Sequence, residues 1–117
     1  MGRTIRRTAL RVNQVPTPDV PLGAHGVGHY TLPEGFHETP MTKPFAEVFW
    51  GIKGRGRFVI DGVDMVLPPD HIAVYLPGMV HEFSAIDDAW EMWWWTLDGP
   101  LASGVLSGMG LSPGVFE

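Results

Sequence analysis

The second half of the chain consists of short runs of apolar and β-branched residues that tight turns separate. These runs predict strands over residues 46–53, 57–60, 63–67, 71–76, 81–85 and 90–97. The pattern before residue 45 is weaker, and it predicts strands near 9–12 and over 26–31, then a proline-containing loop over 32–44. Many short strands joined by glycine and proline turns are typical of an all-β barrel.

The strongest local signal is the dipeptide Asp61-Gly62, which lies between two apolar runs. A two-residue type I′ turn needs a positive φ at both positions, and Asp-Gly meets that need. Because the turn fixes the register of the hairpin, we expect Ile60 opposite Val63 and Phe58 opposite Met65.

Residues 90–97 are apolar on both faces of the predicted strand. Alternation places Trp93, Trp95 and Leu97 on one face and Trp90, Met92, Trp94 and Thr96 on the other. We expect one face to meet the barrel interior and the other to be covered by a helix or a second subunit. A helix is predicted over 100–109, where apolar residues recur at helical spacing after Pro100.

Length and composition restrict the class of protein. The 117 residues suffice for one hydrophobic core, and the absence of cysteine excludes disulfides, thiol catalysis and cysteine-ligated zinc. The net charge of −5 argues against direct nucleic-acid binding, so the N-terminal cluster of Arg3, Arg6, Arg7 and Arg11 is interpreted as a solvated arm. No signal peptide and no apolar stretch of about 20 residues is visible, so we expect no membrane association and a cytoplasmic location.

Strand alternation gathers the residues that could carry chemistry on one side of the predicted sheet. Glu47, Phe49, Gly51 and Lys53 share a face, as do His81, Phe83 and Ala85 on a later strand. Aromatic walls with a few convergent polar groups are typical of small-ligand sites. We therefore predict a pocket with apolar walls and three polar points, formed by Phe49, Phe83, Met92 and Trp94 together with Glu47, Lys53 and His81. His25 and His29 are expected to have no function.

Four segments together resemble the cupin-type sensor domain of the arabinose-regulator (AraC) family of transcription factors. They are Trp50-Gly51-Ile52-Lys53-Gly54-Arg55-Gly56, the Asp61-Gly62 turn, Leu76-Pro77-Gly78-Met79-Val80-His81-Glu82-Phe83, and Trp93-Trp94-Trp95-Thr96-Leu97-Asp98-Gly99-Pro100. The resemblance implies a cupin barrel, a double-stranded β-helix or jelly roll, with a short C-terminal helix. It also implies a non-enzymatic role as a homodimeric sensor that binds a small-molecule effector.

The same resemblance implies a division of the chain. We expect an N-terminal arm over 1–25, the effector-binding barrel over 26–99 and the start of a linker-helix region over 100–117. DNA binding would belong to a C-terminal domain outside this chain. The family's pocket arginine and tyrosine are matched by Lys53 and Phe83, and its pocket tryptophan by Trp94. Lysine lacks the bidentate fork of arginine, and phenylalanine lacks the hydroxyl of tyrosine. The effector therefore need not be arabinose, and a more apolar or anionic molecule is expected.

Metal binding is the alternative that the cupin motifs raise. In metal-binding cupins the first motif supplies two histidines and a glutamate, and the second supplies one histidine. Here Glu47 and His81 match, but residues 40–43 read Pro-Met-Thr-Lys, so the histidine pair is missing. Catalytic metal sites use three protein ligands, and we predict no metal and no cofactor. A free-standing cupin oxygenase or sugar isomerase that uses Glu47 and His81, with His37 as a third ligand, stays open, as does a dimerisation module with a vestigial pocket.

Overall fold

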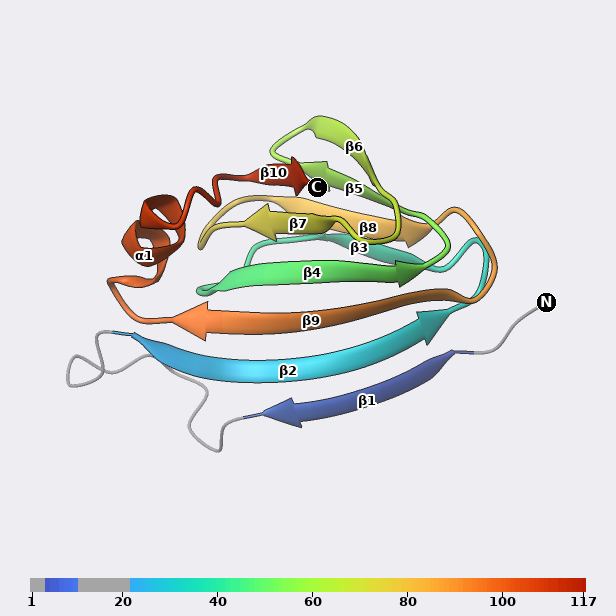
Figure 1. The fold of residues 1–117 in the computed structure, drawn as a ribbon, viewed down its shortest axis with the longest axis horizontal. Coiled ribbons are helices and arrows are strands. Elements are labelled where there is room, and N and C mark those ends of the chain that lie inside the picture. The colour runs from blue at the N-terminus through green and yellow to red at the C-terminus, as the bar shows by residue number, and fades with distance from the viewer. Residues whose placement is uncertain (1–3, 11–21) are drawn as a thin grey trace.

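The fold consists of two antiparallel β-sheets that face each other, with one short helix at the end of the larger sheet (Figure 1). The computed structural model describes residues 4–10 and 22–117. The strands are β1 (Ile5–Leu10), β2 (Gly23–Leu32), β3 (His37–Met41), β4 (Ala46–Lys53), β5 (Gly56–Ile60), β6 (Val63–Leu67), β7 (Ile72–Tyr75), β8 (His81–Ala85), β9 (Trp90–Asp98) and β10 (Gly114–Phe116), and the helix is α1 (Ala102–Gly108).

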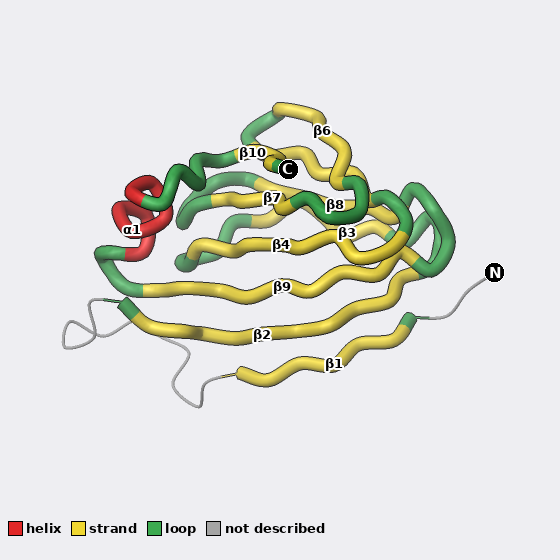
Figure 2. The backbone as a smooth tube through the Cα atoms, in the orientation of Figure 1, coloured by secondary structure: helices red, strands yellow, loops and turns green. Residues whose placement is uncertain are grey.

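The strand order shows how the chain winds between the two sheets. The larger sheet has the order β1-β2-β9-β4-β7-β10, and the smaller one has the order β3-β8-β5-β6 (Figure 2). Most neighbours are far apart in sequence, so each sheet is assembled from several parts of the chain. This arrangement is the predicted all-β barrel of the jelly-roll type, with its short C-terminal helix.

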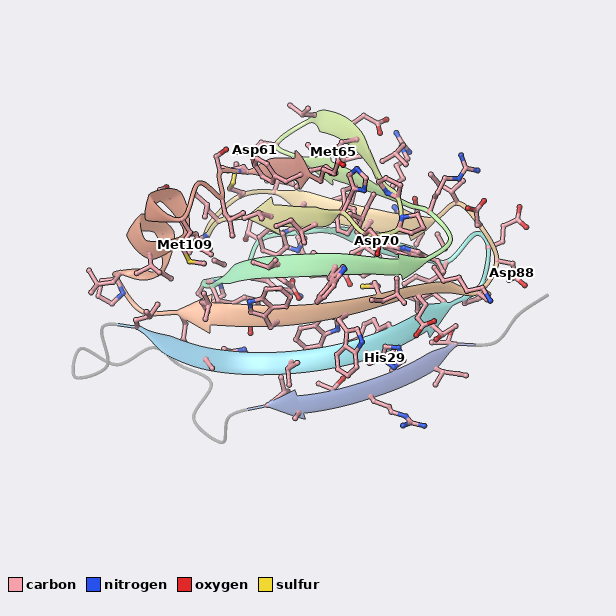
Figure 3. All side chains as sticks on the ribbon, viewed as in Figure 1. His29, Asp61, Met65, Asp70, Asp88 and Met109 are labelled. Atoms are coloured by element: carbon pink, nitrogen blue, oxygen red, sulfur yellow. The ribbon has the colours of Figure 1, made fainter. Side chains whose placement is uncertain are left out.

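The β5–β6 hairpin has the predicted turn and register. Asp61 and Gly62 have φ of 47° and 80°, which are the positive values of a type I′ turn, and Asp61 lies at the tip of the hairpin (Figure 3). Ile60 pairs with Val63, and Phe58 pairs with Met65. The side chains of Phe58 and Ile60 are therefore directed into the core, where both are buried.

The main core fills the space between the sheets. It contains most of the large buried side chains, including Phe49, Phe58, Tyr75, Phe83 and Trp90. The inner face of β9 contributes Trp90, Met92 and Trp94, which confirms the predicted alternation. Burying so many aromatic rings supplies most of the hydrophobic stabilisation of a domain of this size.

A second, smaller cluster lies on the outer face of the larger sheet. Ala102 and Leu106 of α1 pack there against Val48 and Val74, with Trp95 and Leu97 of β9 at the edge of the contact. The helix thus covers one end of the outer face, as the sequence predicts for one side of β9. Trp93, on the same face, is 43% exposed beyond the reach of the helix.

Three parts of the backbone differ from the sequence prediction. The loop predicted over 32–44 contains strand β3. The strand expected near 9–12 starts earlier, at Ile5, and includes Ala9 and Leu10. The rest of that expected strand lies outside the described residues. Gly114–Phe116 form a strand on the edge of β7. No helix in the described part of the chain is long and apolar enough to cross a membrane.

Candidate functional site

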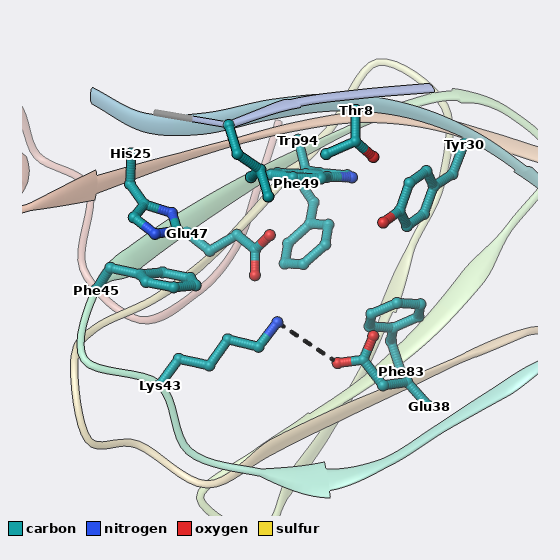
Figure 4. A pocket seen from close by; sticks show the side chains of 11 residues that line it. Thr8, His25, Tyr30, Glu38, Lys43, Phe45, Glu47, Phe49, Phe83 and Trp94 are labelled. Carbon is teal, nitrogen blue, oxygen red and sulfur yellow. Dashed lines mark ion pairs between the residues drawn. The ribbon is translucent and has the colours of Figure 1, made fainter. Parts of the chain in front are cut away.

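A cavity of about 290 Å³ lies between the two sheets, and β1 and β3 both contribute side chains to its lining (Figure 4). Its lining comes from both sheets and from the segment between β3 and β4. The lining residues are Thr8, Leu10, His25, Tyr30, Glu38, Lys43, Phe45, Glu47, Phe49, Phe83 and Trp94. This mixture of aromatic walls and a few polar groups is what small-ligand sites contain.

Trp94 forms one wall because a glycine on β2, Gly28, leaves room for its ring. Gly28 is the partner of Trp94 across the β2–β9 pair, and a Cβ added at Gly28 would overlap the indole. A Cβ at Gly26 would lie 3.5 Å from the same ring. Tyr30 meets the indole edge-on, with ring centroids 5.7 Å apart. The indole is thereby held against β2, with its free side available to the cavity.

Glu47 is the most deeply buried acid of the site. It extends from β4 into the cavity and accepts a hydrogen bond from the Tyr75 hydroxyl. Burial raises the pKa of the Glu47 carboxyl to about 7, while Lys43 and the Tyr75 hydrogen bond act in the opposite direction. Burial, with the nearby Glu47 charge, also raises the pKa of Tyr75, so the phenol stays a donor.

Lys43 places an ammonium group between two carboxyl groups. Its Nζ lies 4.0 Å from Glu38 Oε1, and in Figure 4 it is directed into the space between Glu38 and Glu47. The same Nζ lies 5.6 Å from the centroid of the Phe45 ring. Partial burial raises the pKa of Glu38, against the opposing influence of Lys43 and Arg6. The polar side of the cavity therefore contains two acids and one base.

His81 lies behind this polar group, fully enclosed. Its ring stacks on Tyr75, with centroids 3.7 Å apart and an interplanar angle of 16°. Its Nδ1 faces the Met79 carbonyl at 3.4 Å, and its Nε2 faces Glu38 Oε1 at 4.0 Å. Burial lowers the pKa of His81 to about 4, so the ring is neutral at pH 7. Because a carbonyl can only accept, the contact with Met79 favours the tautomer with the proton on Nδ1, in which Nε2 is an acceptor.

The residues predicted from the sequence fall into three groups in the structure. Glu47, Phe49, Phe83 and Trp94 all line the cavity. His81 is buried next to it, in contact with Tyr75, and Met92 is part of the main core rather than the lining.

Lys53 lies apart from the cavity, exposed at the end of β4. The register between β4 and β9 shifts between Gly51 and Lys53, so the alternation that would place Lys53 on the face of Glu47 is broken. The prediction that these two residues share a face is therefore wrong, and the reason is a β-bulge.

Several lining residues were not predicted. Lys43 and Glu38 come from the segment interpreted as a loop, and Tyr30 and Thr8 come from weakly patterned strands. His25, expected to have no function, lines the cavity, stacks on Phe45 at 4.6 Å and contacts Thr96 Oγ1 through Nδ1 at 3.2 Å. The only sequence signal for Lys43 and Glu38 is their charge, which Glu34 and His37 of the same proline-containing segment share.

The donor set does not fit the metal site of metal-binding cupins. Glu47 and His81 contact the same tyrosine from different sides, one through its hydroxyl and the other through its ring. His37 is exposed, and its Nε2 lies 2.7 Å from the Glu82 carboxylate. Within residues 4–10 and 22–117 no three histidine, aspartate or glutamate side chains are arranged to hold a metal ion.

Comparison with protein families decides the family. The model of the AraC-like ligand binding domain matches residues 26–117, which is most of the chain. The chain belongs to the AraC-like ligand binding domain family. The resemblance seen in the four sequence segments is thereby confirmed, and the family is one of ligand-binding domains. Comparison with curated proteins finds no significant match.

Solved structures show that this AraC-like domain has the cupin fold. A conserved protein of unknown function from Streptococcus pyogenes, SPY1581, is similar with a TM-score of 0.68 and 17% identity, over 82% of this chain and 75% of that one. KdgF from Halomonas sp. has a TM-score of 0.63 and 15% identity, over 80% and 79%. The Cnp3 cupin domain from Schizosaccharomyces pombe has a TM-score of 0.64 and 10% identity, over 96% and 74%.

Proposed function

We propose that the chain is the effector-sensing domain of a cytoplasmic AraC-family transcription regulator, and that the effector binds in the cavity lined by Trp94 and Glu47. The observation that carries this proposal is the cavity itself: about 290 Å³ of space within the barrel of a chain that belongs to a ligand-binding family. The predicted ligand contacts at Phe49, Phe83, Trp94 and Glu47 are consistent with it. DNA binding is assigned to a further domain of the parent protein.

Sensing would follow from where the cavity lies. Its lining joins β4 and β9 of the larger sheet to β3 and β8 of the smaller one, and β1 contributes Thr8 and Leu10. A ligand that contacts all of these strands stabilises the arrangement in which they surround it. The ligand therefore shifts the population between arrangements by its differential affinity for them, and an attached domain responds to that shift.

A cavity-filling variant tests the site. Thr8 is directed into the cavity from β1 (Figure 4), so Thr8→Trp should fill space that the effector needs. Arg7→Trp is the matched control, because the neighbouring residue of a strand points to the opposite face. Sugars, amines and carboxylic acids are screened by thermal shift. We expect to find compounds that raise the melting temperature of the parent chain and of Arg7→Trp but not that of Thr8→Trp. Stabilisers that act equally on all three would contradict the assignment of the site.

The role as a regulator has its own test. The coding sequence downstream of codon 117 should encode linker helices and a helix-turn-helix domain, and a reading frame that closes soon after that codon would end the proposal. Homodimer formation belongs to the same proposal, with the uncovered outer-face residues Trp50 and Trp93, 47% and 43% exposed, as its surface. Sedimentation analysis should show a dimer that dissociates when Trp93 is replaced by arginine.

The proposal also excludes a catalytic metal. Elemental analysis of protein purified without an affinity tag should find no stoichiometric transition metal. A stoichiometric metal that is lost in His81→Ala would instead favour the metalloenzyme interpretation.

A further inference from the structure

We propose that the effector is a small organic cation, a primary amine on one compact apolar or aromatic body, whose ammonium group is bound beside Glu38 and Glu47. This inference rests on the proposed sensing function and names the chemical class that the same cavity would accept. It keeps the apolar body expected from the sequence, where Phe83 lines the cavity, and replaces the anionic alternative, for which Lys53 was the expected cationic group of the pocket. Lys53 is exposed and does not line the cavity.

The charges that line the cavity favour a cation. Among the described residues the lining carries two carboxyl groups, Glu38 and Glu47, and one ammonium group, Lys43. Arg6 lies over the rings of Tyr30 and Phe36, 5.4 and 5.0 Å from their centroids, and does not line the cavity. With both acids ionised the lining has an excess of one negative charge. An arriving cation balances it, whereas an arriving anion adds to the negative charge beside Glu38 and Glu47.

The structure already shows how an ammonium group fits this space. Lys43 Nζ lies between the two acids, 4.0 Å from Glu38 Oε1, and over the face of Phe45 (Figure 4). The distance is longer than a hydrogen bond, so the contact is a loose ion pair. Lys43 is in the segment between β3 and β4, and its side chain is 29% exposed. We infer that it can move outward when a ligand brings a second ammonium group.

Two buried atoms beside the cavity need a hydrogen-bond donor. Glu38 Oε1 and His81 Nε2 are enclosed, and within the described part of the chain neither has a hydrogen-bond partner. They face each other at 4.0 Å. Both are acceptors in the tautomer that the Met79 carbonyl favours, with the proton of neutral His81 on Nδ1. Two acceptors side by side require a group with several N–H or O–H bonds, and an ammonium group has three.

The walls suit a cation as well. Five of the lining residues are aromatic, namely Tyr30, Phe45, Phe49, Phe83 and Trp94. The faces of such rings attract cations, most strongly where water is excluded. They also bury an apolar body, while the enclosed Trp94 Nε1–H, which has no hydrogen-bond partner among the described residues, is left to donate to an acceptor on the ligand or to water. A cavity of about 290 Å³ corresponds to roughly ten water-sized groups, which is the size of one ring with a short side chain.

Three near-isosteric probes separate charge from shape. The chain is titrated by calorimetry at pH 8 with 2-phenylethylamine, 2-phenylethanol and phenylacetate, which share a ring and a short chain and differ in charge. We expect the amine to bind about tenfold or more tightly than the alcohol, as for one charge-assisted contact, and phenylacetate to bind more weakly than either. Equal affinities for amine and alcohol, or tightest binding by phenylacetate, would overturn the proposal.

Two substitutions identify the groups that bind the ammonium. Glu38→Gln keeps the shape of the side chain, and it should weaken amine binding about tenfold while leaving the affinity for the alcohol unchanged. Glu34→Gln, at an exposed residue away from the lining, is the matched control. Lys43→Met removes the ammonium group already in the cavity, so it should strengthen binding of the amine and weaken binding of phenylacetate. The opposite pair of changes would show that Lys43 binds an anionic ligand and would contradict the cationic effector.

The pH dependence supplies an independent readout. The titratable groups that act on Glu47 are Lys43, Tyr75 and Glu38, and His25 lies beside it (Figure 4). The pKa of Glu47 is about 7, and a bound cation favours its ionised form, so amine affinity should rise between pH 6 and pH 8, with proton release on binding. Affinity that falls over this range would contradict the proposal.

The failure of this inference is distinguishable from failure of the sensing role. If none of the three probes binds at millimolar concentration, the compact amine is rejected as the ligand class. The screen with Thr8→Trp and Arg7→Trp still decides whether the cavity is an effector site for another class of molecule.

Discussion

The indole ring of Trp94 packs directly against Gly28, its partner on the neighbouring strand. Gly28→Ala would place a methyl group where the ring now lies, so the ring would have to shift, and the cavity that it lines is open space beside it. We expect a loss of about 1–3 kcal/mol in the free energy of unfolding, as for other overpacked sites, and a weaker affinity for any ligand of the cavity. Urea denaturation and tryptophan fluorescence would measure the two effects.

Gly104→Ala is the matched control for that substitution. Gly104 is an exposed residue of α1, and no described atom lies within 4 Å of the position that its Cβ would take. Alanine inside a helix is favoured over glycine, so this variant should gain about 0.5–1 kcal/mol. A Gly28→Ala variant that behaves like Gly104→Ala would show that the Trp94 contact does not restrict the site.

The packing of α1 on the larger sheet gives a second prediction. Leu106 is 2% exposed and belongs to the cluster with Val48 and Val74, so Leu106→Ala should lower the free energy of unfolding by about 2 kcal/mol or more. Met109, 69% exposed just after the helix (Figure 3), is the control, and Met109→Ala should change it by less than about 0.5 kcal/mol. Equal losses in the two variants would mean that the helix does not depend on this contact.

The buried acid predicts a loss of stability with rising pH. Burial raises the pKa of Glu47 from 4.5 to about 7 in the folded chain. The folded state therefore binds this proton more tightly than the unfolded state, and the free energy of unfolding falls as the pH rises from about 4.5 to 7. The fall in the free energy of unfolding is about 3 kcal/mol, and Glu47→Gln should abolish it. Denaturation of both proteins at several pH values checks it; parallel pH profiles would contradict it.

The buried imidazole predicts the opposite trend over almost the same range. The pKa of His81 is lowered from 6.5 to about 4, so the stability that its neutral form contributes is complete above 6.5 and is lost as the pH falls toward 4. His81→Gln should therefore lose less stability on acidification than the parent chain. The parent itself should show a shallow profile, because Glu47 and His81 oppose each other. If the variant loses as much stability below pH 6.5 as the parent chain does, groups other than His81 cause the acid unfolding.

Local chemistry made parts of this fold predictable from sequence. Asp61-Gly62 determines a turn type, and the turn type determines which residues of β5 and β6 face each other. The two-sided apolar pattern of β9 likewise indicated a strand covered on both faces. From these elements the aromatic wall of the cavity followed, including Phe83 and Trp94.

The polar side of the cavity depends on irregular backbone, which composition does not reveal. Pro40 lies in β3 at a register shift between Glu38 and Met41, on the edge of its sheet, where a missing N–H is tolerated. The strand therefore forms despite its proline and brings Glu38 to the cavity. The bulge after Gly51 removes Lys53 from it. In both places one extra residue decides which side chain points inward.

The position of β9 between β2 and β4 has a consequence for synthesis of the chain. Both of its neighbours are made before it, so while the ribosome is still producing residues 1–89 the larger sheet lacks its central strand. Phe49 and Tyr30, which later face Trp94, have no covering wall at that stage. We expect a nascent chain truncated before Trp90 to engage chaperones, and the cavity to form only when nearly the whole domain has emerged.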